Sequence, residues 1–197
     1  LRQAMELSFT SLKRAGWSDN ALRVGDSFPA LELTDGSGAR FSLARILGRS
    51  PLIVSFFCGH WSPYCNLELR AFNALLPKIQ ALGARFIPVV GQDAELNFST
   101  QRCNRLSYTL FSDPELAAAR TCGLVMTLPE VMTDAMEQLG IDLPGYVPGR
   151  PYEMSMPASF LIDSKGKIIY SFVDEDFRHR AEPEALLSAL QLLQPGN

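Results

Sequence analysis

The segment Ile53-Val54-Ser55-Phe56-Phe57-Cys58-Gly59-His60-Trp61-Ser62-Pro63-Tyr64-Cys65-Asn66 carries the strongest structural signal in this chain. Its first half is apolar and rich in β-formers, which predicts a buried strand that ends at a short turn. The turn leads into a helical pattern over residues 66–82, so Cys65 stands at the helix N-terminus. There the helix dipole and unpaired N–H groups favour the thiolate, the nucleophilic form of cysteine. We therefore predict a redox or nucleophilic site, against the alternative of a buried, inert cysteine.

The composition is that of an ordinary globular chain. Its 197 residues suffice for one domain with a sizeable core. Lys and Arg number 18 against 21 Asp and Glu, and no basic cluster stands out, so no nucleic-acid partner is expected. The apolar run at 52–57 is too short to span a bilayer, and no secretory signal is visible. We expect a cytoplasmic protein without a membrane partner.

The cysteine pattern points to redox chemistry. The four cysteines are Cys58, Cys65, Cys103 and Cys122, widely spaced and without a C-x-x-C pair, and the chain has two histidines. This spacing argues against a structural zinc site. In a core-rich chain of this length, a redox role for some of the cysteines is favoured over a disulfide framework. No metal and no organic cofactor is expected.

Strand and helix patterns alternate along most of the chain. Strands are predicted at 31–34, from 40 onward, and at 52–57, 85–90, 108–111, 159–163 and 167–173; helices are predicted within 1–24 and at 66–82, 94–106, 113–122, 128–139 and 184–193. Residues 143–152 are rich in proline and glycine and predict a loop. Alternation that ends in an antiparallel hairpin is typical of a three-layer α/β/α sandwich with a mixed sheet. We assign this single domain to 24–197, after a helical N-terminal extension at 1–23.

This order of elements resembles the thioredoxin fold. The string Val24-Gly25-Asp26-x-x-Pro29-x-Leu31-x-Leu33 is similar to the opening motif of the peroxiredoxin (AhpC/TSA) superfamily, and Ser112-Asp113-Pro114 and the hairpin at 160–168 also resemble it. The resemblance covers about residues 24–193. Two strings are more specific, because they resemble a peroxiredoxin-like subgroup: Trp61-Ser62-Pro63-Tyr64-Cys65-Asn66-Leu67-Glu68-Leu69-Arg70 and Val173-Asp174-Glu175-Asp176-Phe177-Arg178-His179-Arg180-Ala181-Glu182-Pro183.

The resemblance implies a function and site residues. Peroxiredoxins carry P-x-x-x-[TS]-x-x-C, which places the peroxide-attacking cysteine at Cys65 and the substrate-holding hydroxyl at Ser62. It implies a thiol-dependent peroxidase that reduces hydrogen peroxide or organic hydroperoxides through a sulfenic acid. The partner would be a thiol reductant of the thioredoxin or glutathione type. Trp61 and Tyr64 are predicted to form an apolar wall around the thiol.

Two positions depart from the superfamily pattern. Cys58 stands where the motif has its leading proline. Pro157 stands where an activating arginine is expected, and it resembles the cis-proline of thioredoxins instead. Another cation must then activate Cys65, and the sequence leaves four candidates open: Arg70, Arg150, Arg178 and Arg180. We include Arg70 and Pro157 among the predicted substrate-binding residues.

The thiol that resolves the sulfenic acid is left open. Some peroxiredoxins place it in the second helix, which implies Cys103 here; Cys58 and an external thiol are the alternatives, and Cys122 is predicted to be packing. His60 could titrate near neutral pH or make an ordinary turn contact.

Two rival functions are kept. Pro157 favours a thioredoxin-type thiol–disulfide oxidoreductase, while Ser62 disfavours it, because the first thiol of a C-x-x-C pair is missing. A non-catalytic redox-sensing domain on the same fold is the second rival. A homodimer through the N-terminal helix is left open.

Overall fold

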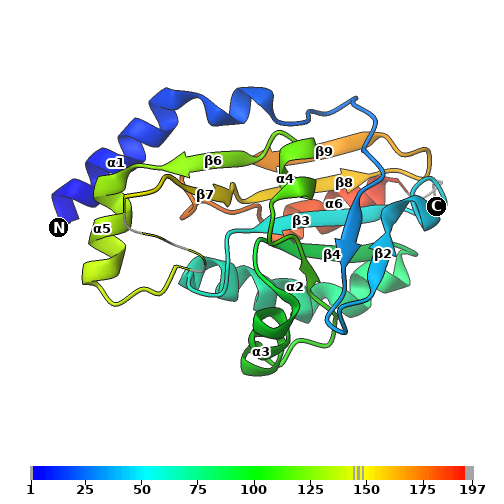
Figure 1. The fold of residues 1–197 in the computed structure, drawn as a ribbon. Helices are drawn as coiled ribbons and strands as arrows, with labels where there is room; N and C mark the ends of the chain where they lie inside the picture. Colours follow the sequence, from blue (N-terminus) through cyan, green and yellow to red (C-terminus); the bar gives the residue numbers. More distant parts are fainter. Residues whose placement is uncertain (1, 144, 146, 148, 194–197) are drawn as a thin grey trace.

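A seven-stranded mixed sheet forms the centre of the molecule (Figure 1). The computed structural model describes residues 2–143, 145, 147 and 149–193. The strands lie in the order β2-β1-β5-β4-β3-β8-β9, and helices lie on the sides of the sheet. The strands of this sheet are β1 (Glu32–Thr34), β2 (Arg40–Ser42), β3 (Leu52–Phe57), β4 (Arg85–Val90), β5 (Phe111–Ser112), β8 (Ala158–Ile162) and β9 (Ile168–Val173). The predicted thioredoxin-like α/β/α architecture is confirmed.

β3 is the central strand, as its continuous apolar run predicts. All six of its residues are buried, which suits a strand covered on both faces. It pairs in parallel with β4 and antiparallel with β8, so Phe56 lies opposite Val89 on one side and Ala158 on the other. The parallel pairs β3–β4 and β4–β5 and the antiparallel pairs β3–β8 and β8–β9 make the sheet mixed.

The helices match the predicted pattern to within a few residues, with one later start. Their bounds are α1 (Arg2–Ala15), α2 (Pro63–Ala81), α3 (Ala94–Asn104), α4 (Ala117–Thr121), α5 (Glu130–Gln138) and α6 (Pro183–Leu192), with short 3-10 helices at Trp17–Asn20 and Leu43–Arg45. α2 packs against α6, and α1 packs against α5. α4 begins at Ala117 rather than at 113, because the Asp113 carboxylate accepts the N–H groups of Ala118 and Ala119 from outside the helix.

A small second sheet was not predicted. β6 (Val125–Leu128) pairs antiparallel with β7 (Tyr152–Ser155), although the sequence predicted a helix from 128 and a loop over 143–152. Each strand has only four residues, too few for a period to stand out, and the pairing joins segments far apart in the chain. β5 is also shorter than predicted. Pro144, Tyr146 and Pro148 of the predicted loop and residues 194–197 of the predicted domain lie outside the described residues.

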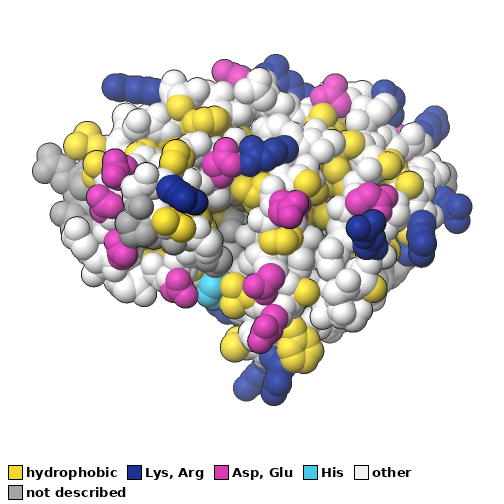
Figure 2. Space-filling view, in the orientation of Figure 1, with side chains coloured by type: hydrophobic (Ala, Val, Ile, Leu, Met, Phe, Trp, Pro, Cys, Tyr) yellow, Lys and Arg dark blue, Asp and Glu magenta, His cyan; other side chains and the backbone are white. Residues whose placement is uncertain are grey.

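The visible surface carries mixed charge. Figure 2 shows acidic and basic side chains interspersed over one face of the molecule. Within the described part of the chain, no helix combines the length and apolar character needed to cross a membrane. The described residues also contain no group of three or more His, Cys, Asp or Glu side chains placed to hold a metal ion.

Candidate active site

The turn between β3 and α2 places Cys65 in the first turn of the helix, as predicted. Ser62 is the N-cap, and its hydroxyl oxygen accepts the N–H of Cys65 at 3.3 Å. Pro63 takes the first helical position, where its missing N–H costs nothing. Gly59 has a φ of +156°, and a Cβ there would lie 2.7 Å from Nε1 of Trp61, so this turn requires glycine.

Arg180 lies directly against the cysteine. Its Nη2 is 3.2 Å from Sγ of Cys65 and 3.6 Å from Sγ of Cys58. Its Nη1 donates to Oε2 of Glu68 at 3.3 Å, and its Nε donates to the carbonyl of Phe177 at 3.0 Å. Only 11% of the Arg180 side chain is exposed. One buried guanidinium therefore contacts two sulfurs and a carboxyl group.

These contacts shift the pKa values of the two buried cysteines in opposite directions. Burial opposes ionisation of Cys65, but hydrogen bonds from the Cys58 thiol, Gly59 N–H and the Ser62 hydroxyl, with the charge of Arg180, lower the pKa of Cys65 well below its usual value. Burial and the neighbouring Cys65 thiolate raise the pKa of Cys58 well above its usual value. Cys65 has the closer contact to Arg180 and the helix N-terminus, so we place the thiolate there.

Glu68 is a buried carboxyl group next to this thiolate. Burial raises the pKa of Glu68 to about 8, although the charge and hydrogen bond of Arg180 act in the opposite direction. Near neutral pH the group is therefore mostly protonated and hydrogen-bonded, which leaves the charge of Arg180 to Cys65. A protonated carboxyl within one helical turn of Cys65 is also a source of protons for a leaving oxygen.

The state of Glu68 predicts a fall in reactivity at alkaline pH. Above about pH 8 Glu68 ionises and competes with Cys65 and the incoming oxygen for Arg180. We expect the rate constant of the Cys65 thiolate with hydrogen peroxide to fall several-fold between about pH 7 and 9. Stopped-flow measurement of Cys65 oxidation across this range checks it. Glu68→Gln should flatten the profile, and Glu184→Gln, an exposed control on α6, should not; a flat profile in the unmodified protein would contradict the prediction.

Trp61 and Tyr64 lie beside the cysteine turn. Both line a largely apolar hollow of about 380 Å³ between α1, α5 and the turn. Tyr64 also borders a second hollow of about 370 Å³, which reaches Glu68 and Arg180. Trp61 and Tyr64, the two side chains predicted to form an apolar wall, therefore lie between the cysteine turn and these two hollows. Nε1 of Trp61 and Nδ1 of His60 are buried and have no hydrogen-bond partner among the described residues.

Arg70 and Cys103 lie on a different side of α2. Nη1 of Arg70 donates to Oδ1 of Asn104 at 2.5 Å, and no contact to Cys65 is recorded for it among the described residues. Cys103 is exposed on α3, and it shares with Arg70 a cleft of about 640 Å³ between α2 and α3. The structure thus brings these two residues together, but not to the buried sulfur of Cys65.

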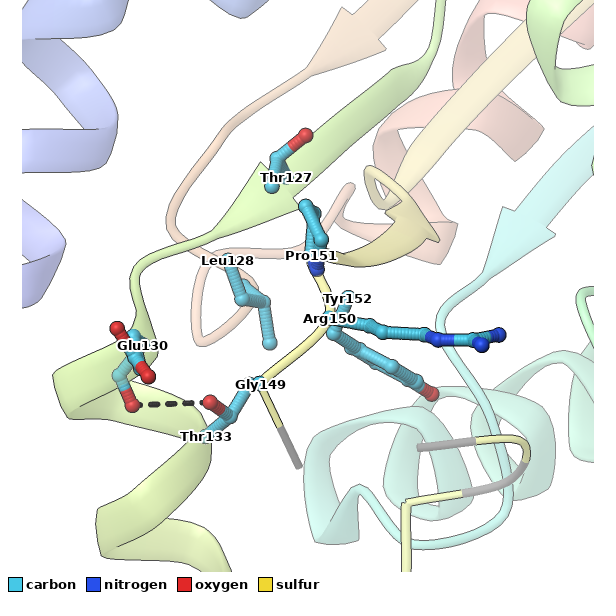
Figure 3. Close-up of a pocket in the computed structure, with 8 residues that line it drawn as sticks. All are labelled: Thr127, Leu128, Glu130, Thr133, Gly149, Arg150, Pro151 and Tyr152. Carbon is cyan, nitrogen blue, oxygen red and sulfur yellow. Dashed lines mark hydrogen bonds between the residues drawn. The ribbon is translucent and has the colours of Figure 1, made fainter. Parts of the chain in front are cut away.

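The other candidate arginines have different surroundings. Arg178 binds Asp176 at 2.7 Å and Glu6 of α1 at 2.8 Å. Arg150 lines a pocket of about 280 Å³ beside β6 and α5, where its side chain projects next to that of Tyr152 (Figure 3). Burial is the main cause that raises the pKa of Tyr152, and the nearby Cys58 sulfur adds to it.

Pro157 does not reproduce the thioredoxin cis-proline. The described residues contain no cis peptide bond, so Pro157 follows a trans bond. It is buried immediately before β8, and its carbonyl accepts the N–H of Asp174 at 3.4 Å. Pro157 therefore continues the β8–β9 pairing in extended backbone, and the expected likeness at this position was wrong.

The loop that carries Arg180 is held by the N-terminal extension. Phe177 packs edge-to-face on Phe9 of α1 and on Trp61, with ring centroids 5.0 Å and 5.4 Å apart. The guanidinium of Arg178 lies 3.8 Å from the centre of the Phe9 ring, a cation–π contact. Glu175 accepts the N–H of Ser18 at 2.8 Å. These contacts position the segment from which Arg180 reaches Cys65.

Sequence reasoning did not single out Arg180 and gave no role to Glu68. One signal was available for both. The subgroup patterns that the two strings resemble, Trp-Cys-Pro-Tyr-Cys-Asn-Leu-Glu-Leu-Arg and Val-Asp-x-Asp-[YF]-x-x-Arg-Ala-Glu-Pro, fix the positions of Glu68 and Arg180, whereas Arg178 and His179 stand at variable positions. The four arginine candidates could have been reduced on that ground alone.

Comparison with known proteins agrees with the fold. The family model described as the AhpC/TSA family matches residues 24–171. A chloroplastic peroxiredoxin Q from Populus jackii is 26% identical over 168 residues, which cover 84% of this chain and 68% of that protein. A chloroplastic protein described as a putative peroxiredoxin Q, from Oryza sativa subsp. indica, is 29% identical over 121 residues, which cover 59% of this chain and 55% of that protein.

Solved structures share the fold. The crystal structure of peroxidoxin BcpB from Mycobacterium tuberculosis superposes with a TM-score of 0.68 at 18% sequence identity, and the match covers 88% of this chain and 99% of that one. The central sheet, the position of Cys65 and the matched length lead to one conclusion: the chain belongs to the AhpC/TSA family and has the thioredoxin fold of the peroxiredoxins.

Proposed function

We propose that this chain is a thiol-dependent peroxidase that reduces hydrogen peroxide or organic hydroperoxides, with Cys65 as the nucleophile and Arg180 as its activating cation. The observation that carries the proposal is the 3.2 Å contact between Nη2 of Arg180 and Sγ of Cys65 at the N-terminus of α2. A permanent cation and a helix N-terminus both favour the thiolate. The membership of the AhpC/TSA family supports the same reaction.

In the first step the Cys65 thiolate attacks one peroxide oxygen and the O–O bond breaks. The sulfur becomes a sulfenic acid, and the other oxygen leaves as hydroxide or alkoxide and takes up a proton. Arg180 stabilises the charge that moves from sulfur to oxygen, and Ser62 helps hold the peroxide. Glu68, which is mostly protonated below about pH 8, is one buried proton donor beside Arg180, and the Cys58 thiol is another. No step needs a metal or an organic cofactor.

Peroxide must reach a fully buried sulfur. Cys65 and Ser62 have no exposed surface, whereas Glu68 and Arg180 line the hollow of about 370 Å³ that opens beside Tyr64. We place the peroxide path there, past the guanidinium. A path along a cation suits small polar peroxides.

Turnover requires two electrons from thiols. The reductant is a thiol of the thioredoxin or glutathione type, and Cys103, Cys58 or the external thiol itself resolves the sulfenic acid.

The alternative function, a thioredoxin-type thiol–disulfide oxidoreductase, loses the residue that favoured it, because Pro157 follows a trans bond. A cytoplasmic location and a homodimer remain predictions.

Site-specific oxidation tests the proposal. The reduced protein is mixed with substoichiometric hydrogen peroxide in the presence of dimedone, which captures sulfenic acids, and the adducts are mapped by mass spectrometry. We expect the adduct at Cys65 before any at Cys58, Cys103 or Cys122, because Cys65 alone combines a lowered pKa with the Arg180 contact. Adducts confined to other cysteines, or peroxide turnover that survives Cys65→Ser, would overturn it.

A further inference from the structure

The site contains a second thiol that the peroxide reaction leaves unused. Sγ of Cys58 lies 3.6 Å from the same Nη2 atom of Arg180 that contacts Cys65. The Cys58 thiol also hydrogen-bonds to Cys65, and the N–H of Gly59, the next residue in the chain, donates to the Cys65 sulfur. The two sulfurs therefore lie side by side in one buried pocket.

Cys103 does not lie beside the Cys65 sulfur in this structure. It is exposed on α3 and faces the cleft lined by Pro63, Asn66 and Arg70. Sγ of Cys65 points to the opposite side of α2, toward Arg180, and is fully buried. A disulfide needs sulfurs about 2.05 Å apart, so pairing with Cys103 would require the first turn of α2 to open. Pairing with Cys58 joins two buried sulfurs that already contact the same nitrogen of Arg180.

We propose that Cys58 is the resolving thiol, and that it forms a Cys58–Cys65 disulfide inside the folded pocket. The inference rests on the proposed peroxidase function and specifies its second step. It also gives a role to the residue that departs from the family motif, since Cys58 stands where that motif has proline.

The step balances without a further reactant. Peroxide converts the Cys65 thiolate to a sulfenic acid, which removes the neighbouring negative charge, the cause that adds to burial in raising the pKa of Cys58. Arg180 then contacts Cys58, the one of the two cysteines that is still a thiol. The Cys58 thiol loses its proton as its sulfur attacks Sγ of Cys65, the S–O bond breaks, and the hydroxide leaves with that proton as water. An external thiol reductant returns two electrons to the disulfide.

Mass spectrometry of three proteins tests the proposal: the unmodified chain, Cys58→Ser and Cys103→Ser. Each is treated with one equivalent of hydrogen peroxide, blocked by alkylation at acid pH and digested without reduction. We expect a Cys58–Cys65 peptide in the unmodified chain and in Cys103→Ser, with two thiols lost per peroxide. In Cys58→Ser we expect one thiol lost and a Cys65 sulfenic acid that dimedone captures at least about tenfold more than in the unmodified chain.

The outcomes separate the two proposals. A Cys65–Cys103 peptide in the unmodified chain, or equal dimedone capture with and without Cys58, would overturn the role of Cys58 and leave the peroxidase function intact. An unoxidised Cys65 in all three proteins would overturn the function itself. Cys58→Ala serves as a second variant, because it leaves no buried hydroxyl; circular dichroism establishes that each variant is folded before it is oxidised.

Discussion

Replacement of Arg180 by methionine is expected to slow the reaction of Cys65 with hydrogen peroxide by about 100- to 1,000-fold, the usual loss when one donor to a developing charge is removed. Nη2 of Arg180 is the cation in contact with Sγ of Cys65, at 3.2 Å, and it is buried where its charge is weakly screened. Methionine keeps the long apolar stem and packing volume. Glu68 is already mostly protonated near pH 7, so losing its partner should leave no buried carboxylate unpaired.

Two measurements check this expectation. Stopped-flow kinetics give the rate with peroxide, and the pH dependence of Cys65 alkylation gives its pKa, which should rise because a stabilising positive charge is gone. Arg70→Met is the discriminating variant, since Arg70 was one of the four cations that the sequence left open but donates to Asn104. It should change the rate by less than about threefold, as expected of an exposed substitution. Equal losses in both variants would show that Arg180 has no special role.

The local part of the site could be predicted from the sequence because neighbouring residues build it. A buried strand, a glycine turn, a Ser N-cap and a helix place Ser62 and Cys65 within one short segment. Arg180 lies 115 residues further along the chain, and its contact depends on how the loop after β9 folds back. No local pattern encodes that return. The second sheet was missed for the same reason, since β6 and β7 are short and pair across a long separation.

The two segments that lie outside the match to the family model contact each other in the folded protein. The family model covers residues 24–171, whereas α1 and the loop carrying Phe177 and Arg180 lie outside it. These outer segments contact each other through Phe9, Phe177 and Arg178. In this chain the N-terminal extension is therefore a support for the arginine loop rather than a separate appendage. We therefore expect its removal to affect the site through these contacts.

Replacement of Phe9 by alanine tests that support and is expected to destabilise the protein by about 3 kcal/mol. Phe9 is 4% exposed, its ring packs on Phe177, and the guanidinium of Arg178 lies over its face. Leu7→Ala on the same helix is the matched control, because Leu7 is 64% exposed. It should change stability by less than about 0.5 kcal/mol. Urea unfolding gives both free energies.

The same two variants distinguish positioning from mere stability. If the Phe9–Phe177 contact fixes Arg180, the folded Phe9→Ala protein should react with peroxide more slowly and show a higher Cys65 pKa, while Leu7→Ala should do neither. Both the peroxide rate and the Cys65 pKa are measured well below the urea midpoint. Nearly all of the protein is folded there, so a change reports an altered folded state and not a loss of folded protein. A Phe9→Ala protein that is less stable but fully reactive would mean that α1 adds stability without positioning Arg180. Equal stability of the two variants would mean that α1 does not hold the loop at all, and the contacts of Arg180 with Glu68 and the Phe177 carbonyl would then suffice to place it.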